Sequence, residues 1–171
     1  EITDLIEPVS VDEAYLDISS LSRQALEIAQ LIKDQVFKRT GLTMSVGISY
    51  NKFLAKLASD WNKPNGIKVI DHNMVPDILL PLPVKSVHGI GPKSAKKLND
   101  IGIFTVKDLL NLSKDFIIDL FGKHGTEIYH RIRGKDDREI SINRERKSLG
   151  TESTFSKGSN NRKNLEAYLD K

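Results

Sequence analysis

The chain has 171 residues, of which 39% are hydrophobic and 29% are charged, and it carries a net charge of +3 and no cysteine. This composition is enough to bury a core in one or two domains and excludes a disordered or fibrous chain. The lack of cysteine excludes disulfide frameworks and thiolate zinc sites, and no apolar run approaches the roughly 20 residues of a membrane helix.

The first predicted element is a strand over residues 9–18. Apolar residues alternate along it until the pattern slips at Asp12 and Glu13, and two adjacent carboxylates are unusual within a strand. The chain starts at Glu1 without a methionine or a helix-capping signal and runs directly into this strand. We therefore expect it to be an interior segment of a longer protein.

An amphipathic helix and a short buried strand are predicted next. Apolar residues recur at three- and four-residue steps over residues 21–36. Ser20 or Ser22 can cap this helix, and Gly41 can end it. Residues 43–48 then read as a strand, and the order strand, helix, strand suggests a crossover unit in a layered sheet.

A second helix is predicted over residues 51–60. Residues 63–66, with the sequence Lys-Pro-Asn-Gly, have the chemistry of a turn, and residues 67–70 read as another strand. The first half of the chain is therefore predicted to be a mixed sheet with helices.

The second half is predicted to be helical and then irregular. Prolines punctuate residues 76–84, and short helices separated by Gly, Ser or Thr follow as far as Gly134. A mostly charged stretch then has the composition of a tether, and residues 148–155 read as the first strand of a third unit. The fold class is α+β, and the predicted units are residues 1–83, 84–134, 135–147 and 148–171.

Charge is unevenly distributed along the chain. Residues 1–84 contain 8 basic and 11 acidic residues, whereas residues 85–147 contain 14 basic and 9 acidic residues. A basic segment beside an acidic one fits a phosphate-backbone grip next to a carboxylate site, although solvated helical faces explain the charges equally well.

One chemical motif is the sequence Val87-His88-Gly89-Ile90-Gly91, which precedes a basic helix. Glycines let the backbone approach a phosphate, and the amides that open the next helix supply donors at the positive end of its dipole. The pattern is that of a helix-hairpin-helix that grips a nucleic-acid backbone without reading bases. The alternative is a Gly-rich loop that closes two helices for packing.

Two further segments have residues suited to phosphoryl transfer. Asp12 and Glu13 offer the oxygen ligands that Mg²⁺ prefers, although such a pair is also common in turns and at exposed edges. Lys56, Asp60 and Lys63 follow at steps of four and three, so they share one helix face where an ammonium can meet a triphosphate. The alternative for these three residues is a solvated charged face.

In order along the chain, these segments resemble the Y-family lesion-bypass DNA polymerases of the bacterial DinB type. The resemblance rests on residues 7–17, on residues 45–66, on the Gly89–Gly91 hairpin and on residues 146–155, and it covers essentially the whole chain. It implies that the chain comprises the C-terminal part of a palm, a helical thumb and the start of a little finger.

The resemblance also implies roles. Asp12 is expected to be a ligand of two catalytic Mg²⁺ ions, with Glu13 as the second carboxylate of the site, near the attacking 3′-hydroxyl of the primer. Lys63 is expected to contact the phosphates of the incoming nucleotide. The residues expected to bind DNA are Gly89, Ile90, Gly91, Lys93, Lys96 and Lys97.

The family's first metal-binding aspartate, its fingers and its ribonucleotide-excluding aromatic residue would lie upstream of Glu1. We therefore expect a monomeric, cytoplasmic chain that is part of a translesion polymerase and is inactive alone. The expected partners are primer–template DNA and a deoxynucleoside triphosphate, and a sliding clamp would dock through a tail beyond Lys171. A DNA-binding module without chemistry is the main alternative, and a nuclease or ligase that shares only the hairpin leaves the Asp12 and Lys63 segments unexplained.

Overall fold

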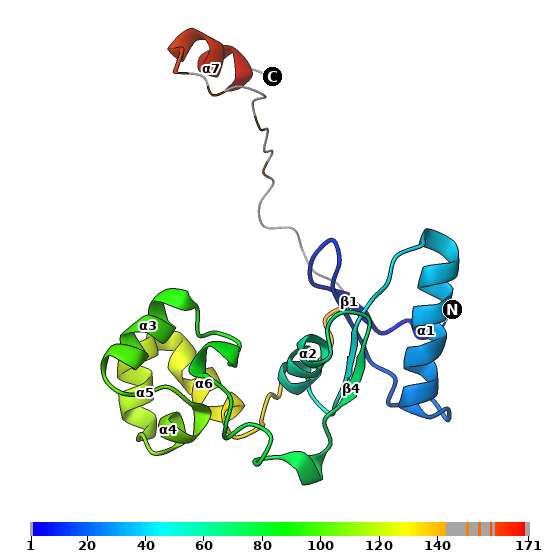
Figure 1. Ribbon diagram of the computed structural model, residues 1–171, viewed down its shortest axis with the longest axis horizontal. Helices are drawn as coiled ribbons and strands as arrows, with labels where there is room; N and C mark the ends of the chain where they lie inside the picture. The colour runs from blue at the N-terminus through cyan, green and yellow to red at the C-terminus, as the bar shows by residue number, and fades with distance from the viewer. Residues whose placement is uncertain (1, 143–149, 151–153, 155–157, 159, 170–171) are drawn as a thin grey trace.

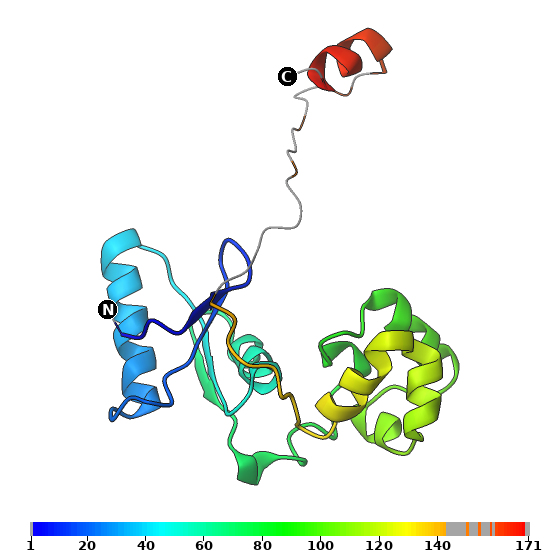
Figure 2. The same ribbon diagram turned by 180° about the vertical axis from the view of Figure 1, so that it is seen from behind.

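The computed structural model describes residues 2–142, 150, 154, 158 and 160–169. The predicted third-unit strand at residues 148–155 therefore lies outside the described residues, apart from two isolated positions. A helix, α7 (Arg162–Leu169), is described near the C-terminus and is drawn apart from the other elements (Figures 1 and 2).

A short hairpin replaces the long strand predicted over residues 9–18. Strands β1 (Ile6–Pro8) and β2 (Ala14–Leu16) pair antiparallel, with Ile6 opposite Leu16. The amides of Val9 and Ser10 donate to the carbonyl of Glu13 at 2.9 and 3.2 Å and close the turn. The slip in alternation at Asp12 and Glu13 falls in this turn, so neither carboxylate lies on a face of the sheet.

The predicted helix is present as α1 (Ala25–Thr40), but Gln24 precedes it and makes no side-chain cap. The expected stop is correct: Gly41 has a φ of 72°, a left-handed conformation that favours glycine, and its amide donates to the carbonyl of Phe37. Only Ile28, Ala29 and Lys33 are buried on α1.

The crossover unit starts at the last strand of the predicted unit, two elements later along the chain. Strands β3 (Val46–Ile48) and β4 (Ile67–Val69) pair in parallel, and α2 (Lys52–Trp61) connects them. Within the described residues the strands thus form two two-stranded sheets, one antiparallel and one parallel. Figures 1 and 2 show α1 on one side of the strands and α2 on the other, toward the helical unit.

Short helices follow one another from residue 85 to residue 131, within the range 85–134 predicted for them. Two single turns of 3₁₀ helix come first, η1 (His72–Met74) and η2 (Val84–Ser86). The remaining elements are α3 (Pro92–Asp100), α4 (Val106–Leu110), α5 (Lys114–Phe121), η3 (Gly122–His124) and α6 (Gly125–Arg131). Thr105 caps α4 through a capping box with Asp108.

The buried apolar side chains of α2, of Ile70 directly after β4 and of the helical region form one cluster. Its fully buried members include Leu54, Ile70, Leu79, Leu98 and Ile128. Among the helices of the described part of the chain, none has the length and apolar character needed to cross a bilayer. The α+β fold class is confirmed, because the described residues contain both helices and strands, and the strands form two small sheets.

Candidate functional site

The β1–β2 turn presents two carboxylates with different surroundings. Asp12 is exposed, and its Oδ1 accepts a hydrogen bond from the Ser10 hydroxyl at 2.6 Å. Glu13 points to α2, where its Oε1 lies 2.5 Å from Lys56 Nζ. Among the described residues, the hairpin therefore holds one carboxylate without an ion pair, Asp12, beside one that is already paired, Glu13.

Helix α2 and the turn after it continue this pair into an alternating row of charges. Lys56 Nζ also lies 3.3 Å from Asp60, and Asp60 lies 2.5 Å from Lys63 Nζ. The three side chains are linked as expected, but not across one helix face: α2 ends at Trp61, so Lys63 reaches Asp60 from the turn that follows the helix. The row begins at Glu13 and ends at Lys63, whose side chain is 54% exposed and can reach an anion.

The electrostatics of the turn keep Asp12 ionised. The Ser10 hydrogen bond lowers the pKa of Asp12, with further lowering by its own backbone amide and by the charges of Lys63 and Lys56. Burial alone would lower the pKa of Lys56, but the Glu13 hydrogen bond and the charge of Asp60 raise it. A cation can therefore meet an ionised Asp12 at neutral pH.

Magnesium prefers several oxygen ligands, and the turn supplies two carboxylates at adjacent positions. No group of three or more metal-ligating side chains occurs among the residues that the structure describes. The donor chemistry of Asp12 and Glu13 fits a hard divalent cation, and the described residues provide only part of a full ligand set.

The stretch after α6, predicted to be a tether, contacts the same region. Asn51 Nδ2 donates to the carbonyl of Gly134 at 2.9 Å, and Asp136 accepts from the backbone amide of Phe53 in the first turn of α2 at 3.0 Å. The Ser141 amide donates to Glu7 at 2.6 Å, and Glu7 also pairs with the buried Lys52. Residues 134–141 thus run along the start of α2 to strand β1.

The predicted Gly89–Gly91 hairpin has the expected backbone. Gly89 has a φ of 104°, which only glycine adopts readily. A Cβ there would also lie 3.2 Å from the guanidinium of Arg131, which donates to the carbonyl of His88 at 3.0 Å. Ile90 is buried, and its amide donates to the carbonyl of Val87 at 2.9 Å, so the expected contact of Ile90 with a ligand does not use its side chain or its N–H. Arg131, buried and distant in sequence, holds the hairpin from behind.

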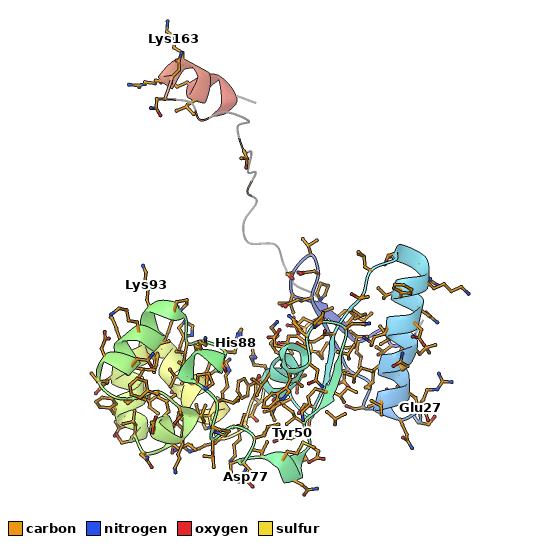
Figure 3. The ribbon with its side chains drawn as sticks, viewed as in Figure 1. Glu27, Tyr50, Asp77, His88, Lys93 and Lys163 are labelled. Carbon is orange, nitrogen blue, oxygen red and sulfur yellow. The ribbon has the colours of Figure 1, made fainter. Side chains whose placement is uncertain are left out.

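The helix that follows the hairpin is basic and open. Gly91 precedes Pro92 at the first position of α3, and a Cβ at Gly91 would meet nothing within 4 Å. Lys93, Lys96 and Lys97 are all exposed, and Lys96 lies 3.2 Å from Asp100. Figure 3 shows Lys93 projecting away from the helical unit.

His88, on the hairpin, has a pKa that depends on burial and on the charges around it. Its ring is partly desolvated, and this desolvation, followed by the positive charges of Arg131 and Arg138, lowers its pKa. The charge of Lys56, on α2, also lowers the pKa of His88. Figure 3 shows His88 on the side of the helical unit that is nearer to α2.

Sequence reasoning missed Glu7, Asp136 and Arg131. Each makes its key contact with a residue more than 40 positions away, in an element that no local pattern connects to it. The buried Lys33 was also missed, because it occupies an apolar helix face as a single charged residue.

Comparison with known protein families gives two matches. The sequence model described as the impB/mucB/samB family matches residues 1–60, and the one described as the IMS family HHH motif matches residues 72–103. The first match contains the Asp12 turn and most of α2. The second contains the Gly89–Gly91 hairpin and α3.

The chain is also similar to named proteins and solved structures. It is 51% identical to DNA polymerase IV of Staphylococcus haemolyticus over 157 residues, 90% of this chain and 44% of that protein. It is 42% identical to DNA polymerase IV of Streptococcus agalactiae over 172 residues, 99% of this chain and 47% of that protein.

A crystal structure of DinB from Sulfolobus solfataricus superposes with a TM-score of 0.72 at 32% identity, covering 80% of this chain and 42% of that one. A post-insertion binary complex of Dbh DNA polymerase superposes with a TM-score of 0.71 at 32% identity, covering 79% and 41%. The chain thus spans about half the length of the relatives that it matches. The two family-model matches, the relatives and the solved structures together show that the chain corresponds to a segment of a DinB-type chain.

Proposed function

We propose that this chain is the palm-and-thumb part of a template-directed translesion DNA polymerase, which adds deoxynucleotides to a primer 3′ end. The observation that carries the proposal is the row from Glu13 through Lys56 and Asp60 to Lys63, with exposed Asp12 beside it. It places carboxylates for a cation next to an ammonium for phosphates, which is the charge arrangement that phosphoryl transfer needs.

In this proposal residues 1–83 form the C-terminal part of the palm and residues 84–134 form the thumb. Residues 135–147 form the basic linker, and residues 148–171 begin the little finger. The contacts of Gly134, Asp136 and Ser141 with α2 and β1 support a linker whose first half is attached to the palm.

Asp12 and Glu13 would hold Mg²⁺ together with ligands outside the described residues. When bound, two such ions neutralise charge on the attacking and leaving oxygens of a phosphoryl transfer. Lys63 would bind the phosphates of a deoxynucleoside triphosphate, and Asp60 orients its ammonium. Lys56 would hold Glu13 in place beside Asp12 until a cation competes for that carboxylate.

The hairpin would bind the backbone of the primer strand. The backbone amides of Gly89 and Gly91, on either side of Ile90, would donate to phosphate oxygens, and Lys93, Lys96 and Lys97 would add charge that acts on any sequence. The buried guanidinium of Arg131, which is paired with Glu127, supports this reading because its hydrogen bond to the His88 carbonyl fixes the hairpin.

We further propose that the 171-residue chain does not extend primers by itself and acts as a monomer in the cytoplasm, with any clamp bound through a tail beyond Lys171. The second candidate function is a DNA-backbone-binding module without chemistry. It is favoured by one observation: the hairpin is complete, whereas the described residues hold no group of three metal-ligating side chains.

The test exchanges the matching segment of the Staphylococcus haemolyticus DNA polymerase IV for this chain and measures primer extension with Mg²⁺ and deoxynucleotides. We expect the chimera to extend primers and Asp12→Asn to slow extension by about 100-fold or more, since it removes a metal ligand. The control Asp137→Asn changes an exposed carboxylate outside the site. Unchanged extension by Asp12→Asn, or a folded chimera that binds DNA without extending it, would contradict the polymerase proposal.

A further inference from the structure

Lys33 is a buried lysine on α1 whose ammonium donates to three neutral oxygens of the described residues. Its residue is 9% exposed, and its Nζ donates to the carbonyls of Met44 at 2.6 Å and Asn65 at 2.7 Å. A third hydrogen bond goes to Oδ1 of the Asn65 side chain. Within the part of the chain that the structure describes, Lys33 makes no ion pair.

Burying a charge without a countercharge costs free energy, so we expect a buried ammonium of this kind where its hydrogen bonds hold other segments of the chain in place. Lys33 uses all three donors of its ammonium, on two segments distant in sequence. Asn65 is 32 residues away and Met44 is 11 residues away. The ammonium therefore ties α1 to the entry of β3 and to the turn between α2 and β4.

That turn carries Lys63 and is tightly closed. Asn65 has a φ of 57°, and a Cβ at Gly66 would overlap the backbone of Asn62. The Val46 amide donates to the Gly66 carbonyl at 2.9 Å, where β3 and β4 begin to pair. Asn65, which Lys33 binds, lies between Lys63 and the close contact at Gly66. Lys33 therefore holds this turn in place from α1.

We propose that Lys33 is a positioning residue that acts through Asn65 to hold Lys63 against Asp60, in the orientation in which Lys63 receives a phosphate. The inference rests on the proposed function for the role of the phosphate, but the placement of Lys63 is measurable without one. Its consequence is that the charge row from Glu13 to Lys63 depends on α1, an element that contributes no side chain to that row.

The test uses NMR on the 171-residue chain. Lys33→Met removes the three donors at similar length, Lys33→Arg retains donors, and Lys38→Met is the matched control, because Lys38 is exposed on the same helix. We expect Lys33→Met to speed amide exchange of Val46 by about tenfold, since the hydrogen bond that protects this amide borders the loosened turn.

The second readout is the pKa of Asp60, which burial alone would raise but which the hydrogen bond from Lys63 and the charge of Lys56 lower. We expect Lys33→Met to raise the pKa of Asp60, Lys33→Arg to restore it, and Lys38→Met to leave it unchanged. In a chain that already carries Lys63→Met, Lys33→Met should no longer change the pKa of Asp60, because its effect passes through Lys63.

An unchanged pKa of Asp60 in Lys33→Met, or an equal change in the Lys63→Met background, would overturn the proposal. If Lys33→Met does not fold, Asn65→Gly replaces it: glycine accepts the φ of Asn65 and removes only the side-chain acceptor. The same criteria then apply to Asn65→Gly. These outcomes are independent of primer extension by the chimera, so failure of the polymerase proposal would be recognised separately.

Discussion

At the scale of single residues, Asp136 has a large structural role that no sequence pattern marks. Its carboxylate side chain is 4% exposed, accepts from the Phe53 amide at the start of α2 and receives two hydrogen bonds from Arg138. It thus stabilises the N-terminus of the helix that carries Lys56, where a negative charge also suits the helix dipole.

We predict that Asp136→Ala lowers the free energy of unfolding by about 1–3 kcal/mol, because it leaves a buried amide and a guanidinium without their acceptor. Chemical denaturation followed by circular dichroism measures the change. Asp137→Ala, at the exposed neighbouring position, is the control and should change stability by less than about 0.5 kcal/mol.

The effect of Asp136 should depend on pH. Burial alone would raise the pKa of Asp136, but the Arg138 hydrogen bonds and the charges of Arg138 and Arg131 lower it. A lowered pKa in the folded state means that the stabilisation is complete above the unfolded value of about 3.9 and is lost as the pH falls through the folded value. The difference between the wild type and Asp136→Ala should therefore shrink in acid. A constant difference down to the acid transition would refute this assignment.

At the scale of elements, the sequence predicts helices better than strand pairing. The three- and four-residue apolar steps of α1 and the Asn51 start of α2 are local signals, and both helices are present within a few residues of the expected bounds. Strand pairing is not local. The slip at Asp12 and Glu13 was interpreted as an irregular strand, whereas it is the turn of a hairpin.

The same division applies to the candidate site. The four-residue step between Lys56 and Asp60 is helix geometry and could be read from the sequence, whereas Lys63 pairs with Asp60 from the turn after α2. The pairing of Glu13 with Lys56 crosses 43 positions, and the Lys33 contact with Asn65 crosses 32. Such contacts depend on how elements pack, which periodicity does not encode.

The close packing of α2 on β3 predicts a strong effect of a small substitution. A Cβ at Gly47 would overlap the backbone of Ala55 and Ser59, and rigid backbone cannot move aside. We expect Gly47→Ala to destabilise the fold by more than about 3 kcal/mol or to prevent folding, as overpacking against backbone does.

The matched control is Gly91→Ala, where a Cβ meets open space and φ is −75°. It should cost at most about 1 kcal/mol as a change of N-cap residue. Thermal unfolding of the two variants gives the comparison. Equal melting temperatures for the two variants would show that α2 does not pack against β3 through Gly47.

At the scale of the whole molecule, the acidic first half and the basic second half each carry one part of the proposed function. The carboxylates lie on the β1–β2 turn, and the three lysines lie on α3 in the helical unit. Residues 134–141 return from the helical unit to the start of α2 and to Glu7. A duplex held by the hairpin would therefore be connected mechanically to the helix that carries Lys56.

The central claim is most directly tested by binding of the chain to a fluorescent primer–template duplex across a salt series. We expect affinity to fall steeply with salt and the triple variant Lys93→Ala, Lys96→Ala and Lys97→Ala to bind more weakly. The slope of log affinity against log salt should become shallower by about 2, since each phosphate contact contributes about 0.9 and Lys96 is shared with Asp100.

The control removes three exposed lysines on other elements, Lys38, Lys107 and Lys123, for the same change in net charge. If the account is right, this control keeps a salt slope closer to the wild type than the α3 variant does. If the wild type does not bind the duplex at low salt, or if both triple variants lose affinity and slope equally, the hairpin and α3 are not a DNA-backbone grip and the account is contradicted.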